Sequence, residues 1–181
     1  MMNRSISQLW QRGRWVLLAL GLSIVSVVLV NLNSKAAAPE TVEFYARPTS
    51  SIASAVAVPG GRGYFWTSGT VPPPLDRNAP AGSRERYGDT KTQALGTLKR
   101  IEERLQQVGL TISDVIYLRV YLVADKFKDN QIDYQGWFDA YKEYFNNSSN
   151  PNKVARSTVG VAGLVVPDWL IEIEAVAVFP E

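Results

Sequence analysis

The sequence predicts an α+β fold in which a six-stranded, mostly antiparallel sheet carries two helices on one face. Three observations support this: two segments with apolar residues at helical spacing, one long segment that alternates apolar and polar residues, and short β-rich segments bounded by glycine and proline. In chain order they read strand, strand, strand, helix, strand, helix, strand, strand. Two helices can cover only one face of such a sheet, so the other face is expected to meet solvent or another subunit.

Three short strands are predicted before the first helix, at residues 42–46, 54–58 and 64–68. The run Gly60-Gly61-Arg62-Gly63 indicates a tight turn, so we expect the second and third strands to form a hairpin. Residues 71–88 hold four prolines, two glycines and mixed charges without periodicity. This stretch is expected to be an irregular surface loop, and loops of such length inside a compact domain are often functional.

Both predicted helices carry an apolar stripe. The first begins after Asp89, a suitable N-cap, and ends at Gly109, a residue suited to the left-handed conformation, with Leu110 folded back onto the last turn. Its stripe consists of Ala94, Leu98, Ile101, Leu105 and Val108. The second helix, at about 131–145, has a largely aromatic stripe that is most simply core, made of Ile132, Phe138, Tyr141 and Phe145.

Three more strands are predicted, at residues 115–123, 155–161 and 170–178. In the first of them Ile116, Leu118, Val120 and Leu122 form an aliphatic face. Its other face carries Tyr117, Arg119 and Tyr121, which could stack on nucleic-acid bases. A packed or interfacial aromatic face is far commoner, so we favour that interpretation.

The composition limits the chemistry that the chain can perform. Its 181 residues, 46% of them hydrophobic, can bury one sizeable core, which we place at residues 39–181. The sequence contains neither histidine nor cysteine, and this excludes a Ser-His-Asp triad, a cysteine nucleophile and a His/Cys zinc site within the chain. General acid and base catalysis must then use Asp, Glu, Lys, Tyr or an oriented water, and no metal or cofactor is predicted.

The charge is unevenly distributed along the chain. The formal net charge is +2, but Arg4, Arg12, Arg14 and Lys35 precede Pro39 without any acidic residue among them. The remaining chain carries 15 basic and 17 acidic residues. A net-negative domain lacks the general attraction to phosphates that nucleic-acid binding normally uses, so no nucleic-acid partner is predicted.

Residues 1–38 are interpreted as a signal peptide or an N-terminal membrane anchor. Basic residues precede an uncharged apolar run at 15–30, and Ala36-Ala37-Ala38 is typical of a cleavage site. The run has a length between that of a long signal and a short membrane span, and Pro39 would hinder cleavage, so both alternatives stay open. In either case the positive-inside rule predicts an exported domain, periplasmic, lumenal or extracellular, that meets the membrane only through an uncleaved segment.

Four motifs hold the unusual polar residues of the domain. They are Trp66-Thr67-Ser68-Gly69-Thr70-Val71-Pro72, then Gln93-Ala94 with Leu98 and Gly109-Leu110, then Ala155-Arg156-Ser157-Thr158-Val159, and finally Ile171-Glu172-Ile173-Glu174-Ala175. In this order they resemble the successive signatures of the RidA/YjgF family, over residues 51–178. The resemblance implies a chorismate-mutase-like fold, a homotrimer with sites in clefts between subunits, and hydrolysis of 2-imino acids or their enamines to 2-keto acids and ammonia.

The resemblance also implies roles for individual residues. Arg156 is expected to bind the substrate carboxylate, a role that suits the planar fork of donors on a guanidinium. Glu172 is expected to orient or activate the water that attacks the C=N carbon, and groups around Ser68, Gly69 and Thr158 are expected to complete the pocket. An iminium carbon is already electrophilic, so the protein need only hold the carboxylate, place a water and accept a proton.

Three positions depart from the best-studied deaminases of this family. Ala55, Phe138 and Thr158 stand where those proteins carry a tyrosine, an asparagine and often a cysteine. The segment between Gly69 and Gln93 is also longer than theirs. The walls of the substrate pocket therefore differ, and the sequence leaves the identity of the substrate open.

Alternative interpretations remain for the same residues. Arg156 could form a structural ion pair with Glu172 or Glu174 that locks the trimer, and one of these glutamates could instead be solvated or bridge subunits. Ser68 could simply cap a turn. The competing function is a non-catalytic trimeric protein that uses Arg156 to bind small carboxylate metabolites.

Overall fold

The structure is a computed structural model, and it describes residues 37–181. The predicted signal or anchor at residues 1–38 therefore lies, except for its last two residues, outside the described part. Between residues 37 and 181, none of the helices has both the length and the apolar character that a membrane span requires.

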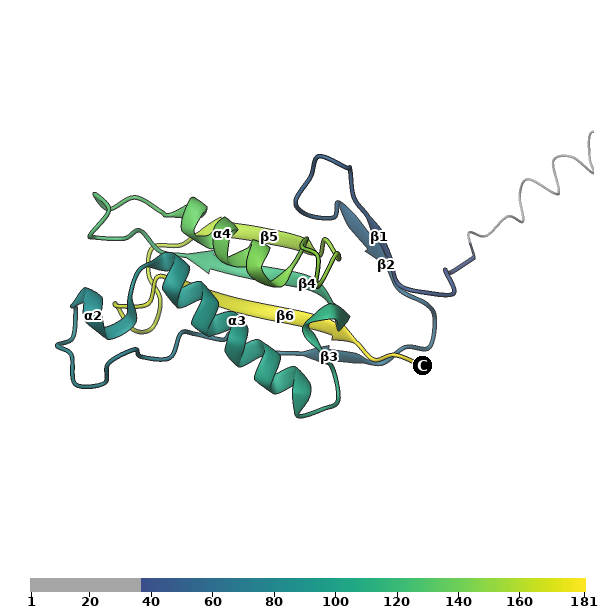
Figure 1. Ribbon diagram of the computed structural model, residues 1–181, viewed down its shortest axis with the longest axis horizontal. Coiled ribbons are helices and arrows are strands. Elements are labelled where there is room, and N and C mark those ends of the chain that lie inside the picture. Colours follow the sequence, from purple (N-terminus) through teal and green to yellow (C-terminus); the bar gives the residue numbers. More distant parts are fainter. Residues whose placement is uncertain (1–36) are drawn as a thin grey trace, which may run out of the picture. The chain divides into compact units, whose positions relative to one another are not determined.

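The six strands form two sheets. β1 (Glu43–Tyr45) pairs antiparallel with β2 (Ala55–Ala57). β3 (Tyr64–Trp66), β6 (Ile171–Val178), β4 (Val115–Leu122) and β5 (Ala155–Gly160) lie side by side in that order in a four-stranded sheet, where β4 and β5 are parallel and the other neighbours antiparallel (Figure 1). The predicted α+β class is confirmed, but the single six-stranded sheet is corrected to two sheets, linked by a bridge between Ala53 and Ala155.

The predicted hairpin between the second and third strands was wrong. Gly61, with φ of 80°, does adopt the left-handed conformation of a turn. After this turn the chain enters the four-stranded sheet as β3 and does not pair with β2. There Tyr64 and Trp66 pair with Val178 and Val176 of β6. Aromatic and β-branched side chains stabilise each other across strands, and the short Ala-Val-Ala strand β2 offers less to such a pairing.

Both long helices lie on the same face of the four-stranded sheet (Figure 1). α3 (Thr90–Gln106) begins as predicted, because the Asp89 carboxylate accepts a hydrogen bond of 2.9 Å from the backbone N–H of Thr92. After the helix Gly109 has φ of 77°, and the N–H of Leu110 returns to the carbonyl of Leu105 at 2.9 Å. α4 (Tyr134–Tyr144) is shorter than the predicted helix.

The core lies between these helices and the sheet. Val108, the last residue of the predicted stripe, does not join the core, because α3 ends at Gln106 and Val108 is 41% exposed. Trp137, which the predicted stripe omitted, is fully buried. Each large apolar side chain buried here contributes about 2 kcal/mol. The cluster includes Ala94, Leu98, Ile101, Leu105, Leu118, Val120, Leu122, Trp137, Tyr141, Phe145, Ile171 and Ile173.

The loop at 71–88 is largely irregular, as predicted, but contains the short helix α2 (Arg84–Tyr87). A second short element that the sequence analysis missed is the 3₁₀ turn η1 (Ile112–Asp114), which precedes β4. The Thr111 and Asp114 side chains form a capping box around it. This turn fixes the direction in which the chain enters the central strand of the domain.

Candidate functional site

The two predicted catalytic residues lie on opposite faces of the four-stranded sheet. Arg156 of β5 lies opposite Leu118 of β4, and Leu118 is buried beneath the helices. Glu172 of β6 lies opposite Tyr121, three residues further along β4. Paired residues share a face and successive residues alternate, so Arg156 is on the helix-covered face and Glu172 on the other, which we call the open face. Within one chain the structure does not bring these two side chains together.

Arg156 packs against three aromatic rings of α4. Its guanidinium carbon lies 5.3, 5.0 and 4.4 Å from the ring centroids of Trp137, Phe138 and Tyr141. One terminal nitrogen, Nη1, is buried without a hydrogen-bond partner, and Arg156 makes no ion pair within residues 37–181. Burial lowers the pKa of Arg156, and Tyr141 partly opposes that shift. A buried cationic donor without a partner is costly unless something binds it.

Within residues 37–181 of a single chain, Glu174 does not pair with Arg156. Glu174 instead contacts Arg119 of β4 at 3.0 Å. It also accepts a hydrogen bond of 3.4 Å from the Tyr121 hydroxyl. This pair lies on the open face, across the sheet from Arg156.

A pocket of about 260 Å³ adjoins Arg156. It is lined by Thr49, Ser51, Gln135, Phe138, Tyr141, Lys142 and Arg156, and we call it the Arg156 pocket. The hydroxyl of Tyr141 is also buried without a hydrogen-bond partner among the described residues. Burial raises the pKa of Tyr141 to about 12, so this hydroxyl keeps its proton and remains available as a donor at neutral pH.

Thr158 and Ala55 lie in different surroundings. Thr158 is on the same face of β5 as Arg156, and its hydroxyl oxygen accepts a hydrogen bond of 3.3 Å from the indole N–H of Trp137. It therefore positions one of the rings that contact Arg156. Ala55 belongs to the separate β1–β2 sheet, is exposed, and does not line the Arg156 pocket.

Gly69 and Glu172 are brought together on the open face. After β3 the chain continues along β6, with hydrogen bonds from the Thr67 N–H to Ala175 and from the Thr70 N–H to Ile173. This path presses Gly69 against Glu172, because a Cβ on Gly69 would stand only 2.7 Å from the carboxyl carbon of Glu172. The adjacent Ser68 is exposed, and its carbonyl accepts a hydrogen bond of 3.1 Å from the Thr70 hydroxyl.

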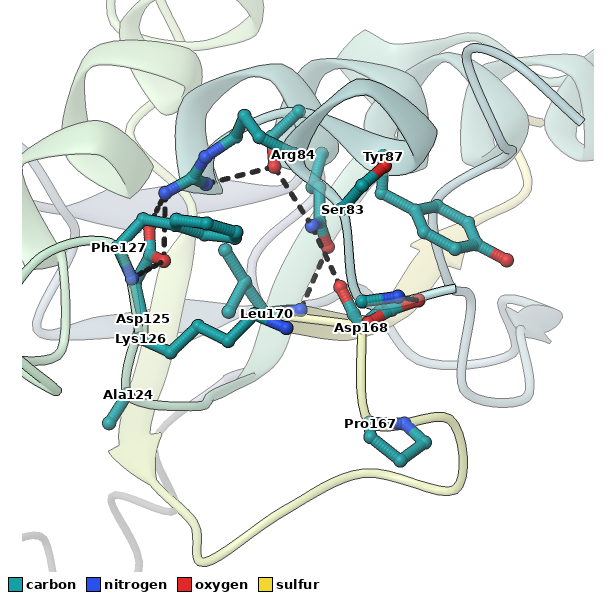
Figure 2. Close-up of a pocket in the computed structure, with 13 residues that line it drawn as sticks. Ser83, Arg84, Tyr87, Ala124, Asp125, Lys126, Phe127, Pro167, Asp168 and Leu170 are labelled. Carbon is teal, nitrogen blue, oxygen red and sulfur yellow. Dashed lines mark hydrogen bonds and ion pairs between the residues drawn. The ribbon is translucent and has the colours of Figure 1, made fainter. Parts of the chain in front are cut away.

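A second, smaller pocket of about 70 Å³ lies beside α2 and contains none of the predicted site residues (Figure 2). Its polar groups are mostly engaged with one another. Arg84 contacts both carboxylate oxygens of Asp125 at 2.8 and 2.7 Å. The Gln93 side chain donates to the carbonyl of Asp168 at 3.0 Å and accepts from the N–H of Leu170 at 2.8 Å. The backbone N–H of Gly82 also donates to the Asp168 carboxylate at 2.8 Å. We interpret this cluster as the anchor that ties the 71–88 loop to the segments that follow β4 and precede β6.

The sequence analysis missed much of the Arg156 pocket. Gln135, Tyr141 and Lys142 lie three residues before and three and four residues after Phe138, the spacing that puts side chains on one side of a helix. That spacing was the available signal for them. Phe138 was expected both in the core stripe and in the pocket wall, whereas Tyr141 was expected in the core alone; both rings pack in the domain and contact Arg156. Thr49 and Ser51 carried no recognisable signal.

Comparison with known proteins gives consistent family matches. The family model described as Endoribonuclease L-PSP matches residues 46–179. A RutC family protein of Pyrococcus horikoshii is 40% identical over 90 residues, which are 50% of this chain and 63% of that protein. A RutC family protein of Haemophilus influenzae is 33% identical over 113 residues, 62% of this chain and 76% of the relative. The match thus spans less than two thirds of the Pyrococcus protein.

Solved structures show the same fold. A Rid family protein of Yersinia pestis superposes with a TM-score of 0.56 at 24% identity, covering 77% of this chain and 99% of the other. A Pseudomonas aeruginosa protein of unknown function superposes with a TM-score of 0.51 at 25% identity, covering 76% and 92%. The family model covers most of the described residues, and the matched range includes all four motifs. The chain therefore belongs to the RidA/YjgF family.

Proposed function

We propose that the chain is a hydrolase that deaminates 2-imino acids and their enamine tautomers. The observation that carries this proposal is the Nη1 atom of Arg156, a buried donor without a partner beside a pocket of about 260 Å³. A carboxylate would satisfy that donor and neutralise the buried charge. Tyr141 lines the same pocket, and its buried hydroxyl has no hydrogen-bond partner among the described residues, so it can donate a further hydrogen bond.

The proposed reaction needs no cofactor. Arg156 holds the carboxylate, so that the neighbouring C=N carbon is fixed in place. Glu172 accepts a proton from a water as its oxygen bonds to that carbon, and the C=N double bond becomes a C–N single bond. Glu172 then returns the proton to the nitrogen. As the C–N bond breaks and ammonia leaves, Glu172 takes the proton of the new hydroxyl group, the carbonyl of the 2-keto acid forms, and the proton passes to the departing ammonia. An enamine enters the same route after protonation of its carbon gives the iminium.

We propose further that the site is completed between copies of the chain in a homotrimer. Glu172 and Arg156 lie on opposite faces of the sheet, so a single copy holds only half of the groups that the reaction needs. On the open face Tyr64 and Trp66 are exposed, Trp66 by 68%, and large exposed apolar groups favour burial against a partner. β5 is an edge strand, which a neighbouring copy can approach.

Enzymatic tests can separate this activity from its alternatives. Imines generated in the assay by an amino-acid oxidase react with semicarbazide, and a deaminase reduces the semicarbazone yield and releases ammonia. Glu172→Gln should abolish this competition while retaining carboxylate binding, and Arg156→Ala should lose both. Glu174→Gln is the matched control, because Glu174 shares the strand and face of Glu172 but pairs with Arg119. Full activity of Glu172→Gln would refute the proposed mechanism.

The non-catalytic alternative has one observation in its favour. Phe138 packs over Arg156, where it narrows the pocket with an apolar ring in place of a polar group. A binding protein would be stabilised against heat by 2-keto acids through Arg156, with no ammonia released from any imine.

We propose an exported location on the sequence alone. An alkaline phosphatase fusion after residue 181 should be active, since that enzyme folds only outside the cytoplasm. Deletion of residues 1–38 should abolish this activity, and an unchanged signal would refute export through this segment.

A further inference from the structure

The Arg156 pocket contains a second cation. Lys142 of α4 lines it together with Arg156 of β5, and none of the seven lining residues is acidic. The other polar groups on the wall are the neutral side chains of Thr49, Ser51, Gln135 and Tyr141. Two positive charges around one small volume match a ligand with two negative charges better than a ligand with one.

Lys142 is only weakly engaged by its own protein. The nearest carboxylate is that of Asp139, whose Oδ1 lies 3.8 Å from the Lys142 ammonium. The same oxygen accepts a hydrogen bond of 2.7 Å from Gln135. Both Lys142 and Asp139 are substantially exposed, and an exposed pair of this length contributes little. Lys91, by contrast, lies 2.8 Å from Glu143.

The pocket has room for more than the group that Arg156 would hold. Its volume of about 260 Å³ approaches the roughly 300 Å³ at which sites for drug-sized ligands begin. A carboxylate bound to Arg156 fills only part of that space. The remaining part can take a short side chain that ends near Lys142, whose flexible stem lets one ammonium reach groups at different positions.

We propose that Lys142 binds a second anionic group of the substrate, so that the site selects imines derived from acidic amino acids. The inference rests on the proposed function in that the first carboxylate of the substrate is placed on Arg156. Lys142 is then a specificity residue, which determines the substrate class and takes no part in the hydrolysis.

Binding of two five-carbon keto acids tests the selectivity without catalysis. 2-Oxoglutarate and 2-oxopentanoate differ only in the second carboxylate, and calorimetry should give about fivefold tighter binding of 2-oxoglutarate, the size expected for one partly exposed ion pair. Lys142→Met should remove most of that preference. Lys91→Met removes a cation from the adjacent surface and should retain it. Equal affinities in the unaltered protein, or a preference that survives in Lys142→Met, would overturn the inference.

Turnover distinguishes this inference from the deaminase proposal. The imines made from glutamate and norvaline form the corresponding pair of substrates, and kcat/KM should favour the glutamate imine through Lys142. Hydrolysis of both imines with equal kcat/KM would refute the selectivity and support the deaminase. Selective binding of 2-oxoglutarate without hydrolysis of either imine would support Lys142 recognition and refute the deaminase.

Discussion

Gly69 lies directly against the carboxylate of Glu172, so that a Cβ on Gly69 would stand only 2.7 Å from the carboxyl carbon. The contact is made with the flexible end of Glu172, so a methyl group on Gly69 would displace this carboxylate and leave the strand in place. Glycine at this position therefore sets the location of the proposed base.

Gly69→Ala should lower kcat for imine hydrolysis by at least about tenfold, since a small displacement of a catalytic group is costly. The free energy of unfolding should change by less than about 1 kcal/mol, because the Glu172 side chain can rotate away. Gly163→Ala is the control, since a Cβ there meets nothing within 4 Å. Steady-state kinetics and urea unfolding give both quantities, and unaltered kcat in Gly69→Ala would contradict the role of Glu172.

Tyr141 makes stability depend on alkaline pH. The pKa of an unfolded tyrosine is about 10, and burial raises that of Tyr141 to about 12. In the folded protein Tyr141 therefore keeps its proton to a higher pH than in the unfolded chain. The Tyr141 contribution to the free energy of unfolding is fully present below pH 10 and falls as the pH rises from 10 toward 12. Relative to pH 8, the Tyr141 contribution at pH 11 should be a loss of about 1 kcal/mol.

Tyr141→Phe should remove that contribution, and at pH 8 it should cost little, because it also removes a buried hydroxyl without a partner. Chemical denaturation at both pH values measures the difference. Tyr134→Phe, at an exposed position on the same helix, should leave the loss between pH 8 and pH 11 unaltered. An equal pH dependence in Tyr141→Phe and the unaltered protein would contradict the assignment.

The anchor of the 71–88 loop depends on one buried carboxylate. Asp125 is 1% exposed and is neutralised by Arg84. Arg84→Met should destabilise the protein by about 3 kcal/mol, because it leaves an unpaired buried charge. The double variant Arg84→Met, Asp125→Leu should be less destabilised than either single variant. Thermal unfolding of the four proteins measures this coupling, and additive effects would show that the pair is not coupled.

Local patterns predicted most elements of the fold. The N-cap at Asp89, the left-handed Gly109 and the alternation of β4 from Leu118 to Leu122 each depend on neighbouring residues, and all three are present. The alternation was wrong at the start of the strand, where a register shift puts Val115 in the core in place of Ile116. Strand pairing, in contrast, depends on residues that lie far apart in the sequence. The glycine turn at 60–63 indicated a hairpin, but β6 offered the aromatic residues of β3 the larger partners Val176 and Val178, where β2 has Ala-Val-Ala.

The candidate site was predictable only in part, for the same reason. Arg156 and Glu172 could be singled out by motif, but their placement on opposite faces depends on the register of β5 and β6 against β4. Lys142 belongs to none of the sequence motifs. Its place in the candidate site is seen only in the structure, where Lys142 of α4 and Arg156 of β5 line the same pocket. Ala55 was singled out by resemblance, and it lies on β2, where it is not among the residues that line the Arg156 pocket.

Because the guanidinium and the carboxylate stand on opposite sides of the sheet, two inactive alleles should rescue each other. An Arg156→Ala chain supplies an intact Glu172, and a Glu172→Gln chain supplies an intact Arg156. Random co-assembly of equal amounts would give about one quarter of the interfaces a full set of groups. Co-refolded mixtures of the two variants should therefore regain imine hydrolysis, which neither variant performs alone. If the active site were built within one chain, every mixture would stay inactive.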